Sequence, residues 1–374
     1  MTSGPRVVRA PHPPHLDHPD AWAYKGRADV EVEAELATFG HDDLVFPADQ
    51  ILVIQGNQRY ARRAVLVAVD PAATADPPRP RDVVGFASYA MPLTDNTHLL
   101  DATLTVRPGR KDGAVHDALL AAVERDAAEA GRRTVGLATD HAPEPPPGPG
   151  AIEAPTGSGR VPADDPTVRA ALRAGFTLRQ VERYSVLTLP VDTGLLGRLH
   201  AEAAEHAGDE YRTHVWDDVV PDEWIDQVAH LQQRMSTDIP HGDLEVSEEA
   251  WDAERYRSLI DEQHARGNVF RMAVAEHVPS GTLAGFTIVV GPATDQFAFQ
   301  EDTLVLSEHR GRRLGMLMKA ANLLALQADR PGMTRIHTWN AEENGPMLDI
   351  NVALGFRGAG VCALWEKPLA SSGG

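Results

Sequence analysis

The sequence of 374 residues contains one cysteine, Cys362, so no disulfide can form within the chain. This cysteine lies in the apolar stretch VCALW, which favours a buried strand residue over a reactive nucleophile. No apolar run approaches the roughly 18 residues that a membrane-spanning helix needs, and the first residues lack the apolar core of a signal peptide. We therefore expect a cytoplasmic protein with no membrane partner.

Positive charge is also scarce, since 35 lysines and arginines face 54 aspartates and glutamates, for a net charge of −19. Nucleic-acid binding needs clustered cations, so the balance argues against a nucleic-acid partner. It is compatible with a cationic small molecule, and equally with a merely solvated acidic surface. His12, His15 and His18 lie among prolines, which favours a flexible tail over residues 1–27 rather than a metal site, so no metal is expected.

The remaining chain repeats itself at an offset near 200 residues, which indicates two copies of a whole domain rather than a solenoid. The offset falls to 180 near the end because the first copy carries a Pro/Gly-rich insertion, expected to be an exposed loop, from Ala142 to Pro166. We predict domains at residues 28–190 and 191–374. The matching segments are Gly85-Phe86 with Gly285-Phe286, Thr103-Leu104 with Thr303-Leu304, and Ala174-Gly175-Phe176 with Leu354-Gly355-Phe356.

The second copy contains the most informative segment, in which an apolar strand ends at Leu306 and the turn RGRRLG leads into an amphipathic helix. Backbone N–H groups converge where a Gly-rich turn enters a helix, and the helix dipole adds positive potential. The segment therefore predicts a site for a phosphate-bearing cofactor. We expect strands at Tyr211–Trp216, Phe270–Glu276, Leu283–Val290, Phe297–Leu306, Arg335–Asn340 and Val361–Lys367.

Two helices are predicted before these central strands, one beginning at Pro221 and one capped by Ser247. The first copy offers less room for such helices, because strand-like apolar runs appear at Leu44–Phe46, Ile51–Ile54 and Ala64–Val69. Four carboxylates belong to the helical region of the second copy, either as ordinary solvated charges or as a recognition site for an ammonium group. They are Asp238, Glu245, Glu249 and Asp252.

The turn RGRRLG resembles the (Q/R)-x-x-G-x-(G/A) motif of the GNAT acyl-CoA-dependent N-acetyltransferases, with Arg313 where that family has its first glycine. The later segments TWNAEENGPM and NVALGF resemble the next strand, helix and terminal turn of the family. The two-copy layout is similar to mycothiol-synthase-like tandem GNAT proteins. In the first copy the turn reads RPGRKDGAVH, with Val115 or His116 at the closing glycine position, where a side chain would block a phosphate.

This resemblance implies two mixed α/β domains, a degenerate first one and a catalytic second one that takes acetyl-CoA as its acyl donor and a small amine as acceptor. It implies that the strand holds the pantetheine arm, the turn holds the pyrophosphate, and residues near the next helix contact the far side. The implied contacts are Thr303, Leu304, Val305, Arg310, Gly311, Arg312, Arg313, Leu314, Gly315, Met316, Asn340, Asn344 and Met347. Capping of a loop and a helix is the alternative role of Asn340 and Asn344.

Acyl transfer to an amine needs a base for the amine, a donor for the oxyanion and a proton for the leaving thiolate. Glu301 is the candidate base, because alternation along the strand puts its side chain on the same face as that of Thr303. The alternative is a solvated Glu301 with Asp302 turned inward. Asn351 stands where the family often has a tyrosine acid, and an amide can only hydrogen-bond the sulfur. A non-catalytic acyl-CoA-binding module and another acyl-CoA reaction remain the competing functions.

Overall fold

A computed structural model describes residues 4–110, 113–238, 240–294 and 296–370 of the chain. The chain forms two compact units, the first from residues 1–182, 242–245 and 360–374, the second from residues 183–241 and 246–359. Strand β8 (Thr177–Thr188) passes from the first unit into the second, and strand β14 (Arg357–Pro368) passes back. None of the helices in the described part of the chain is long and apolar enough to cross a membrane.

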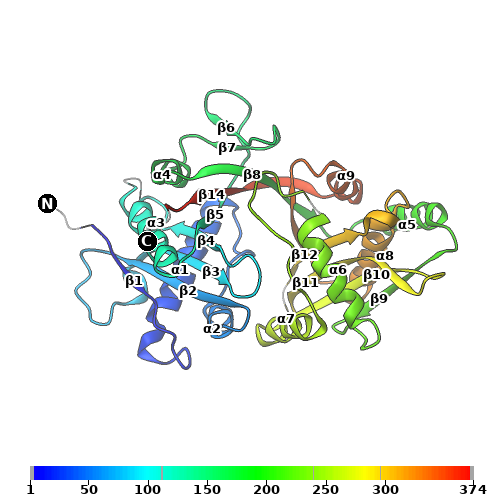
Figure 1. The fold of residues 1–374 in the computed structure, drawn as a ribbon, viewed down its shortest axis with the longest axis horizontal. Coiled ribbons are helices and arrows are strands. Elements are labelled where there is room, and N and C mark those ends of the chain that lie inside the picture. Colours follow the sequence, from blue (N-terminus) through cyan, green and yellow to red (C-terminus); the bar gives the residue numbers. More distant parts are fainter. Residues whose placement is uncertain (1–3, 111–112, 239, 295, 371–374) are drawn as a thin grey trace. The chain divides into compact units, whose positions relative to one another are not determined.

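The first unit is a mixed sheet with the strand order β1-β2-β3-β4-β5-β14 (Figure 1). Its neighbouring strands run antiparallel except β4 and β5, which are parallel. Its elements are β1 (Arg6–Arg9), α1 (Trp22–Thr38), α2 (Ala48–Gly56), β2 (Ala61–Val69), β3 (Val83–Pro92), β4 (Leu99–Val106), α3 (Ala114–Glu129), β5 (Thr134–His141), β6 (Ala151–Glu153), β7 (Arg160–Pro162) and α4 (Pro166–Ala174), with short 3₁₀ turns at Pro19–Ala21 and Pro80–Asp82.

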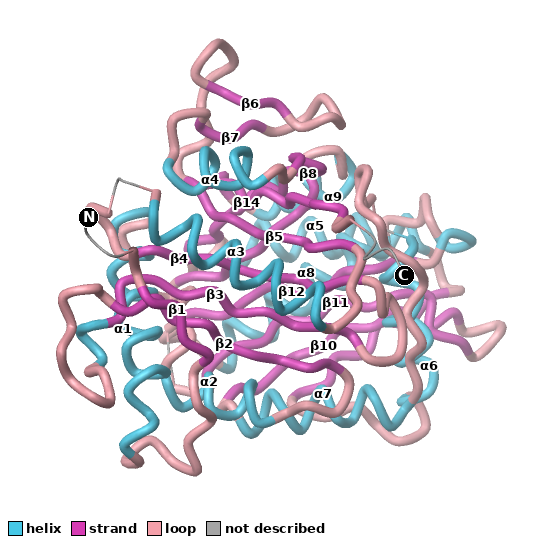
Figure 2. Tube along the Cα trace, turned by 60° about the vertical axis from the view of Figure 1, so that its left-hand side comes forward, coloured by secondary structure: helices cyan, strands magenta, loops and turns pink. Residues whose placement is uncertain are grey.

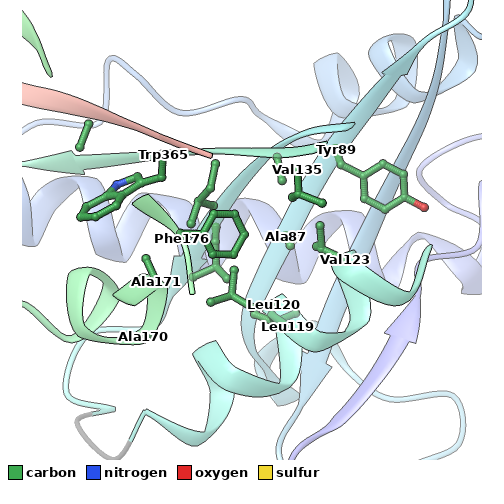
Figure 3. Packing of buried hydrophobic residues seen from close by; sticks show 14 of the residues in the cluster. Ala87, Tyr89, Leu119, Leu120, Val123, Val135, Ala170, Ala171, Phe176 and Trp365 are labelled. Atoms are coloured by element: carbon green, nitrogen blue, oxygen red, sulfur yellow. The ribbon is translucent and has the colours of Figure 1, made fainter. Parts of the chain in front are cut away.

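Helix α3 packs its apolar face on this sheet, as Figure 3 shows for Leu119, Leu120 and Val123 beside Val135. Trp365 of β14 is fully buried in the same core, and its indole N–H donates to Thr139 Oγ1 at 3.0 Å. Each large apolar side chain buried in this way contributes about 1.5–3 kcal/mol. The C-terminal strand is therefore an integral part of the first unit's core.

The second unit repeats this plan, with the strand order β8-β13-β12-β11-β10-β9. Strands β12 and β13 run parallel, and β10, β11 and β12 of this sheet are labelled in Figure 2. Helix α8 packs against α5 and against strands β10 and β11. The elements are α5 (Thr193–Ala207), β9 (Tyr211–Asp217), α6 (Ile225–Asp238), α7 (Ala253–Ala265), β10 (Asn268–His277), β11 (Thr282–Pro292), β12 (Phe297–Val305), a 3₁₀ turn (Ser307–His309), α8 (Leu314–Asp329), β13 (Arg335–Ala341) and α9 (Gly345–Leu354).

The mixed α/β architecture in two copies confirms the predicted fold class, and each expected strand of the second copy is present. The domain boundary differs, however, because β14 pairs with β5 of the first unit from Val361 opposite His141 to Pro368 opposite Thr134. Residues 360–374, predicted as part of the second domain, thus belong to the first unit. No local signal marks such an exchange, since an apolar strand pattern does not specify which sheet it joins.

Three local expectations are wrong. The predicted tail over residues 1–27 contains β1, which pairs with β2, and the start of α1. The apolar run at Ile51–Ile54 lies in helix α2, where Ile51 alone is buried, so the first copy has room for two helices after all. A short apolar run fits a half-buried helix as well as a strand.

Two further differences concern caps and loops. Helix α7 is capped by Asp252 rather than Ser247, because the carboxylate of Asp252 accepts from the backbone N–H of Arg255 at 2.8 Å. The Pro/Gly-rich insertion is not loop throughout, since it forms the hairpin β6–β7 and buries Ala154 and Val161 in the first core. Burial of Cys362 agrees with its predicted role in a strand.

Candidate functional site

The site lies where β12 and β13 of the second unit diverge. Their parallel register covers three residue pairs, from Phe297 opposite Arg335 to Phe299 opposite His337. Immediately beyond it, the Thr338 hydroxyl donates to the Gln300 carbonyl oxygen at 3.0 Å. The strands separate past this point, which leaves backbone groups of β12 available to a ligand because they lack a partner strand on that side.

A bulge shapes β12 at the same place. The register with β11 shifts so that Thr303 faces Thr287 while Gln300 faces Val289, with two residues of β12 between them and only one of β11. The hydroxyls of Thr287 and Thr303 lie 2.7 Å apart, and Gln300 Nε2 donates to Thr287 at 3.0 Å. The simple alternation that placed Glu301 and Thr303 on one face is therefore interrupted.

A cavity of about 600 Å³ opens between β12, the turn after it and the start of α9. It brings together every residue that the resemblance implied for cofactor contact except Met316 and Asn340. Its walls are Asp238, Pro240, Thr303, Leu304, Val305, His309, Arg310, Gly311, Arg312, Arg313, Leu314, Gly315, Glu343, Asn344, Pro346, Met347 and Ile350.

The turn of this cavity holds left-handed backbone at two positions, Gly311 with φ 79° and Arg313 with φ 56°. Arg313 is the N-cap of α8, and its carbonyl accepts from the N–H of Leu317 at 3.0 Å. Its exposed guanidinium reaches toward Glu202 of α5, 4.0 Å away. The arginine thus takes the backbone conformation that glycine favours while its side chain points along the surface.

The other groups of the turn fix its shape and polarity. Arg310 donates to the carbonyl oxygens of Val305, at 3.2 Å, and Asp238, at 3.0 Å, which ties the turn to β12 and to the end of α6. A Cβ added to Gly315 would lie 3.1 Å from Ile350 Cδ1, so a side chain at this position would fill space that the glycine leaves free at the start of α8. The N-terminus of α8 can therefore present several backbone N–H groups to an anion.

Glu301 and Asp302 occupy the bulge. Asp302 accepts from Gln232 Nε2 of α6 at 2.9 Å, so its carboxylate faces the helices. Burial raises the pKa of Asp302, and that hydrogen bond opposes the shift. The side chain of Glu301 is exposed, and Glu301 is not among the residues that line the cavity. Removal from bulk water, with the Asp302 charge second, raises the pKa of Glu301 to about 7, while Arg266 opposes the shift.

Asn351 lies deeper than expected, with 2% of its surface exposed. It does not line the cavity, but its Nδ2 donates to Asn340 Oδ1 at 2.6 Å. Its own Oδ1 accepts from Lys319 Nζ of α8 at 2.8 Å. Sequence analysis missed Lys319, although a lone cation in the apolar helix sequence LGMLMKAANLLAL was a usable signal. Asn344 caps α9 by accepting from the N–H of Met347 at 3.4 Å, so a capping role exists whether or not it contacts a ligand.

The four carboxylates considered for ammonium recognition have structural partners. Asp238 pairs with Arg234 and lines the cavity. Glu249 accepts from the indole of Trp251 at 2.8 Å, and Asp252 caps α7. Glu245 belongs to the first unit, where it accepts from the Thr134 hydroxyl at 2.9 Å. These contacts favour the interpretation of these groups as local structural charges.

The first unit has a smaller cavity of about 280 Å³ at the corresponding turn. Gly113, with φ 75°, caps α3 as Arg313 caps α8. Val115 does not line this cavity, because its side chain packs over Gly85 of β3, where an added Cβ would lie 2.8 Å from Val115 Cγ1. His116 lines it instead, so between the two candidates for the closing position it is the histidine that occupies the wall.

No protein-family model matches the sequence, and curated proteins give no match. Among solved structures, the chain is similar to a tandem GNAT protein from the clavulanic acid biosynthesis pathway, with 21% identity over 99% of this chain and 100% of that one and a TM-score of 0.71.

A GCN5-related N-acetyltransferase from Sphaerobacter thermophilus is 14% identical over 97% of this chain and 95% of its own, with a TM-score of 0.57. The N-myristoyltransferase of Saccharomyces cerevisiae, solved with myristoyl-CoA, is 12% identical over 98% of this chain and 81% of its own, with a TM-score of 0.54. The chain has the tandem GNAT fold that its motifs predicted.

Proposed function

We propose that the second unit binds acetyl-CoA and transfers its acetyl group to the amine of a small, cationic metabolite. The observation that carries this proposal is a single cavity of about 600 Å³ enclosed by the free edge of β12, the arginine-rich turn and the N-terminus of α8. An extended thioester arm needs a strand edge, and a pyrophosphate needs converging N–H groups at a helix start. Both requirements meet here. The similarity to acyl-CoA-using folds supports the same assignment.

The chemistry follows from the groups at the bulge. Glu301, with a pKa of about 7, takes a proton from the ammonium form of the acceptor. The free amine attacks the thioester carbon, a backbone N–H of Thr303, Leu304 or Val305 stabilises the oxyanion, and the C–S bond breaks as the C–N bond is completed. As the tetrahedral intermediate collapses, the nitrogen loses a second proton, and water carries this proton to the departing thiolate. Asn351 takes no part in this step, because its amide is not an acid and is buried outside the cavity.

The net charge of −19 supports a cationic acceptor, since it attracts cations and repels anions over the distance that salt does not screen. A non-catalytic acyl-CoA-binding module is the second candidate. This candidate is favoured because Asn351, which stands where a general acid was expected, is an amide buried outside the cavity. Release of free thiol from acetyl-CoA in the presence of a panel of small amines, with product mass determined, separates transfer from mere binding.

Cofactor binding is tested by calorimetric titration of CoA into Gly315→Glu. The carboxylate would fill the helix entrance and repel phosphate, so binding should be lost. Gly315→Ala is the matched control, because its Cβ meets only the terminal methyl of Ile350, at 3.1 Å, which can shift. Affinity near that of the wild type in Gly315→Glu would refute the assignment of this cavity.

A further inference from the structure

A buried lysine lies behind the proposed site. Lys319, in the middle of α8, exposes 2% of its surface, and its Nζ lies 5.8 Å from the centre of the Phe356 ring. Burial lowers the pKa of Lys319 to about 7. Placing an ammonium in such an environment costs several kcal/mol, and an apolar side chain of equal length would avoid that cost. The lysine therefore weakens the core that it occupies, which suggests a purpose other than stability.

Its hydrogen bonds have a fixed direction. Below a pH of about 7 Lys319 is mostly protonated, and an ammonium only donates, so Asn351 must turn its oxygen toward Lys319 and its Nδ2 toward Asn340. Asn340 must then present its own oxygen to Asn351. The amide hydrogens of Asn340 remain as the outer end of the chain. One buried cation thus determines the orientation of two amides in sequence, which neither amide could fix alone because each can flip.

The outer end of this chain lies at the opening between the strands. Asn340 follows the paired segment of β13 by three residues and precedes Glu343 and Asn344, which line the cavity, by three and four. It is partly exposed, unlike Lys319 and Asn351. A thioester arm lying along β12 would present carbonyl oxygens, which accept hydrogen bonds, toward the facing strand.

We propose that Lys319 and Asn351 are positioning residues that hold the Asn340 amide as a hydrogen-bond donor to a carbonyl oxygen of the acyl-CoA pantetheine arm. This inference rests on the proposed function, since it assumes that the arm lies between β12 and β13. It assigns no proton transfer to Lys319. The lysine acts only through the orientation of the two amides.

The test is calorimetric titration of CoA at a pH below about 7, where Lys319 is mostly protonated, with thermal unfolding of each variant recorded alongside. Lys319→Met removes the cation that fixes both amides, so affinity should fall about tenfold, while the melting temperature should match or exceed that of the wild type because a buried charge is gone. Asn351→Asp keeps the contact with Lys319 but can only accept. It should turn Asn340 around and weaken CoA binding at least as much, with the fold intact. Asn340→Asp removes the donor itself and should weaken CoA binding as much as Asn351→Asp does.

Asn322 supplies the matched control. It is buried on the same helix and donates to the Arg271 carbonyl oxygen at 3.2 Å, away from the chain described above. Asn322→Leu should lower stability and leave CoA affinity unchanged. A merely structural role for Lys319 requires affinity to follow stability across the series, whereas our proposal requires the two to separate.

Failure of this inference can be distinguished from failure of the proposed function, because the wild type tests CoA binding and the variants test the positioning role. If the wild type binds no CoA, the proposed function fails and this inference falls with it. If the wild type binds CoA and both Lys319→Met and Asn351→Asp bind it equally well, the function stands and this inference alone is refuted. Should Lys319→Met fail to fold, the result for Asn351→Asp decides.

Discussion

Arg313 is a position where a substitution should increase the stability of the folded protein. It holds left-handed backbone, φ 56° and ψ 21°, at the start of α8. That conformation costs a residue with a Cβ about 1–2 kcal/mol. Replacement by glycine removes this cost but raises the conformational entropy of the unfolded chain, which lowers the gain in stability by roughly 0.4–1 kcal/mol. The contact with Glu202, at 4.0 Å between two exposed side chains, contributes close to nothing.

The expected net gain for Arg313→Gly is therefore about 0.5–1 kcal/mol, or a rise in melting temperature of roughly 1–4 °C for a unit of this size. Arg313→Ala is the informative partner, because it also removes the guanidinium but keeps the Cβ. Denaturant unfolding followed by tryptophan fluorescence should rank the glycine variant above both the alanine variant and the wild type.

The same pair of variants separates backbone from side chain in cofactor binding. If the guanidinium of Arg313 contacts phosphate, both variants should bind CoA more weakly; if only the backbone N–H groups matter, neither should. Equal stability of Arg313→Gly and Arg313→Ala would refute the strain argument, because the two differ only by the methyl group that creates it.

Two further outcomes are expected. With a pKa of about 7 for Glu301, turnover should rise with pH through about 7 as the carboxylate form becomes populated. Glu301→Gln should lose this rise and should be roughly 10²-fold slower at neutral pH, with the smallest defect at high pH, where free amine is already present. A normal rate of this variant at pH 7 would move the base to Asp302. A fragment of residues 191–374 should be insoluble, because it lacks Leu187 and Leu189 of the second unit's core and carries a β14 without its partner β5, so a soluble, active fragment would contradict this reasoning.

The sequence predicts what local pattern controls. Apolar alternation located β10 to β13 within two residues at each end, and the glycine-containing turn located the start of α8, because both signals lie within a few residues of the structure they produce. The bulge at Glu301 was not predictable in the same way. It depends on the register against β11, and hence on packing between strands that the sequence of β12 does not encode.

The difference between the two cavities shows where motif reading needs the structure. A steric block at the closing glycine position was the expected reason for a degenerate first copy. Of the two candidates, Val115 packs toward the sheet and His116 lines the cavity. Charge gives a stronger argument. Arg107 and Arg110 of that turn are paired with Glu33 and Asp70.

Carboxyl groups also line the first cavity. Burial raises the pKa of Glu35 to about 8 and that of Asp140 to about 6. Bringing a pyrophosphate there would force both carboxyl groups to stay protonated, or would place like charges together at low polarity. The turn of the second unit places Arg312 and Arg313 at the surface beside an open helix N-terminus. Electrostatics, more than the glycine count, therefore favours the second unit as the site of an anionic cofactor.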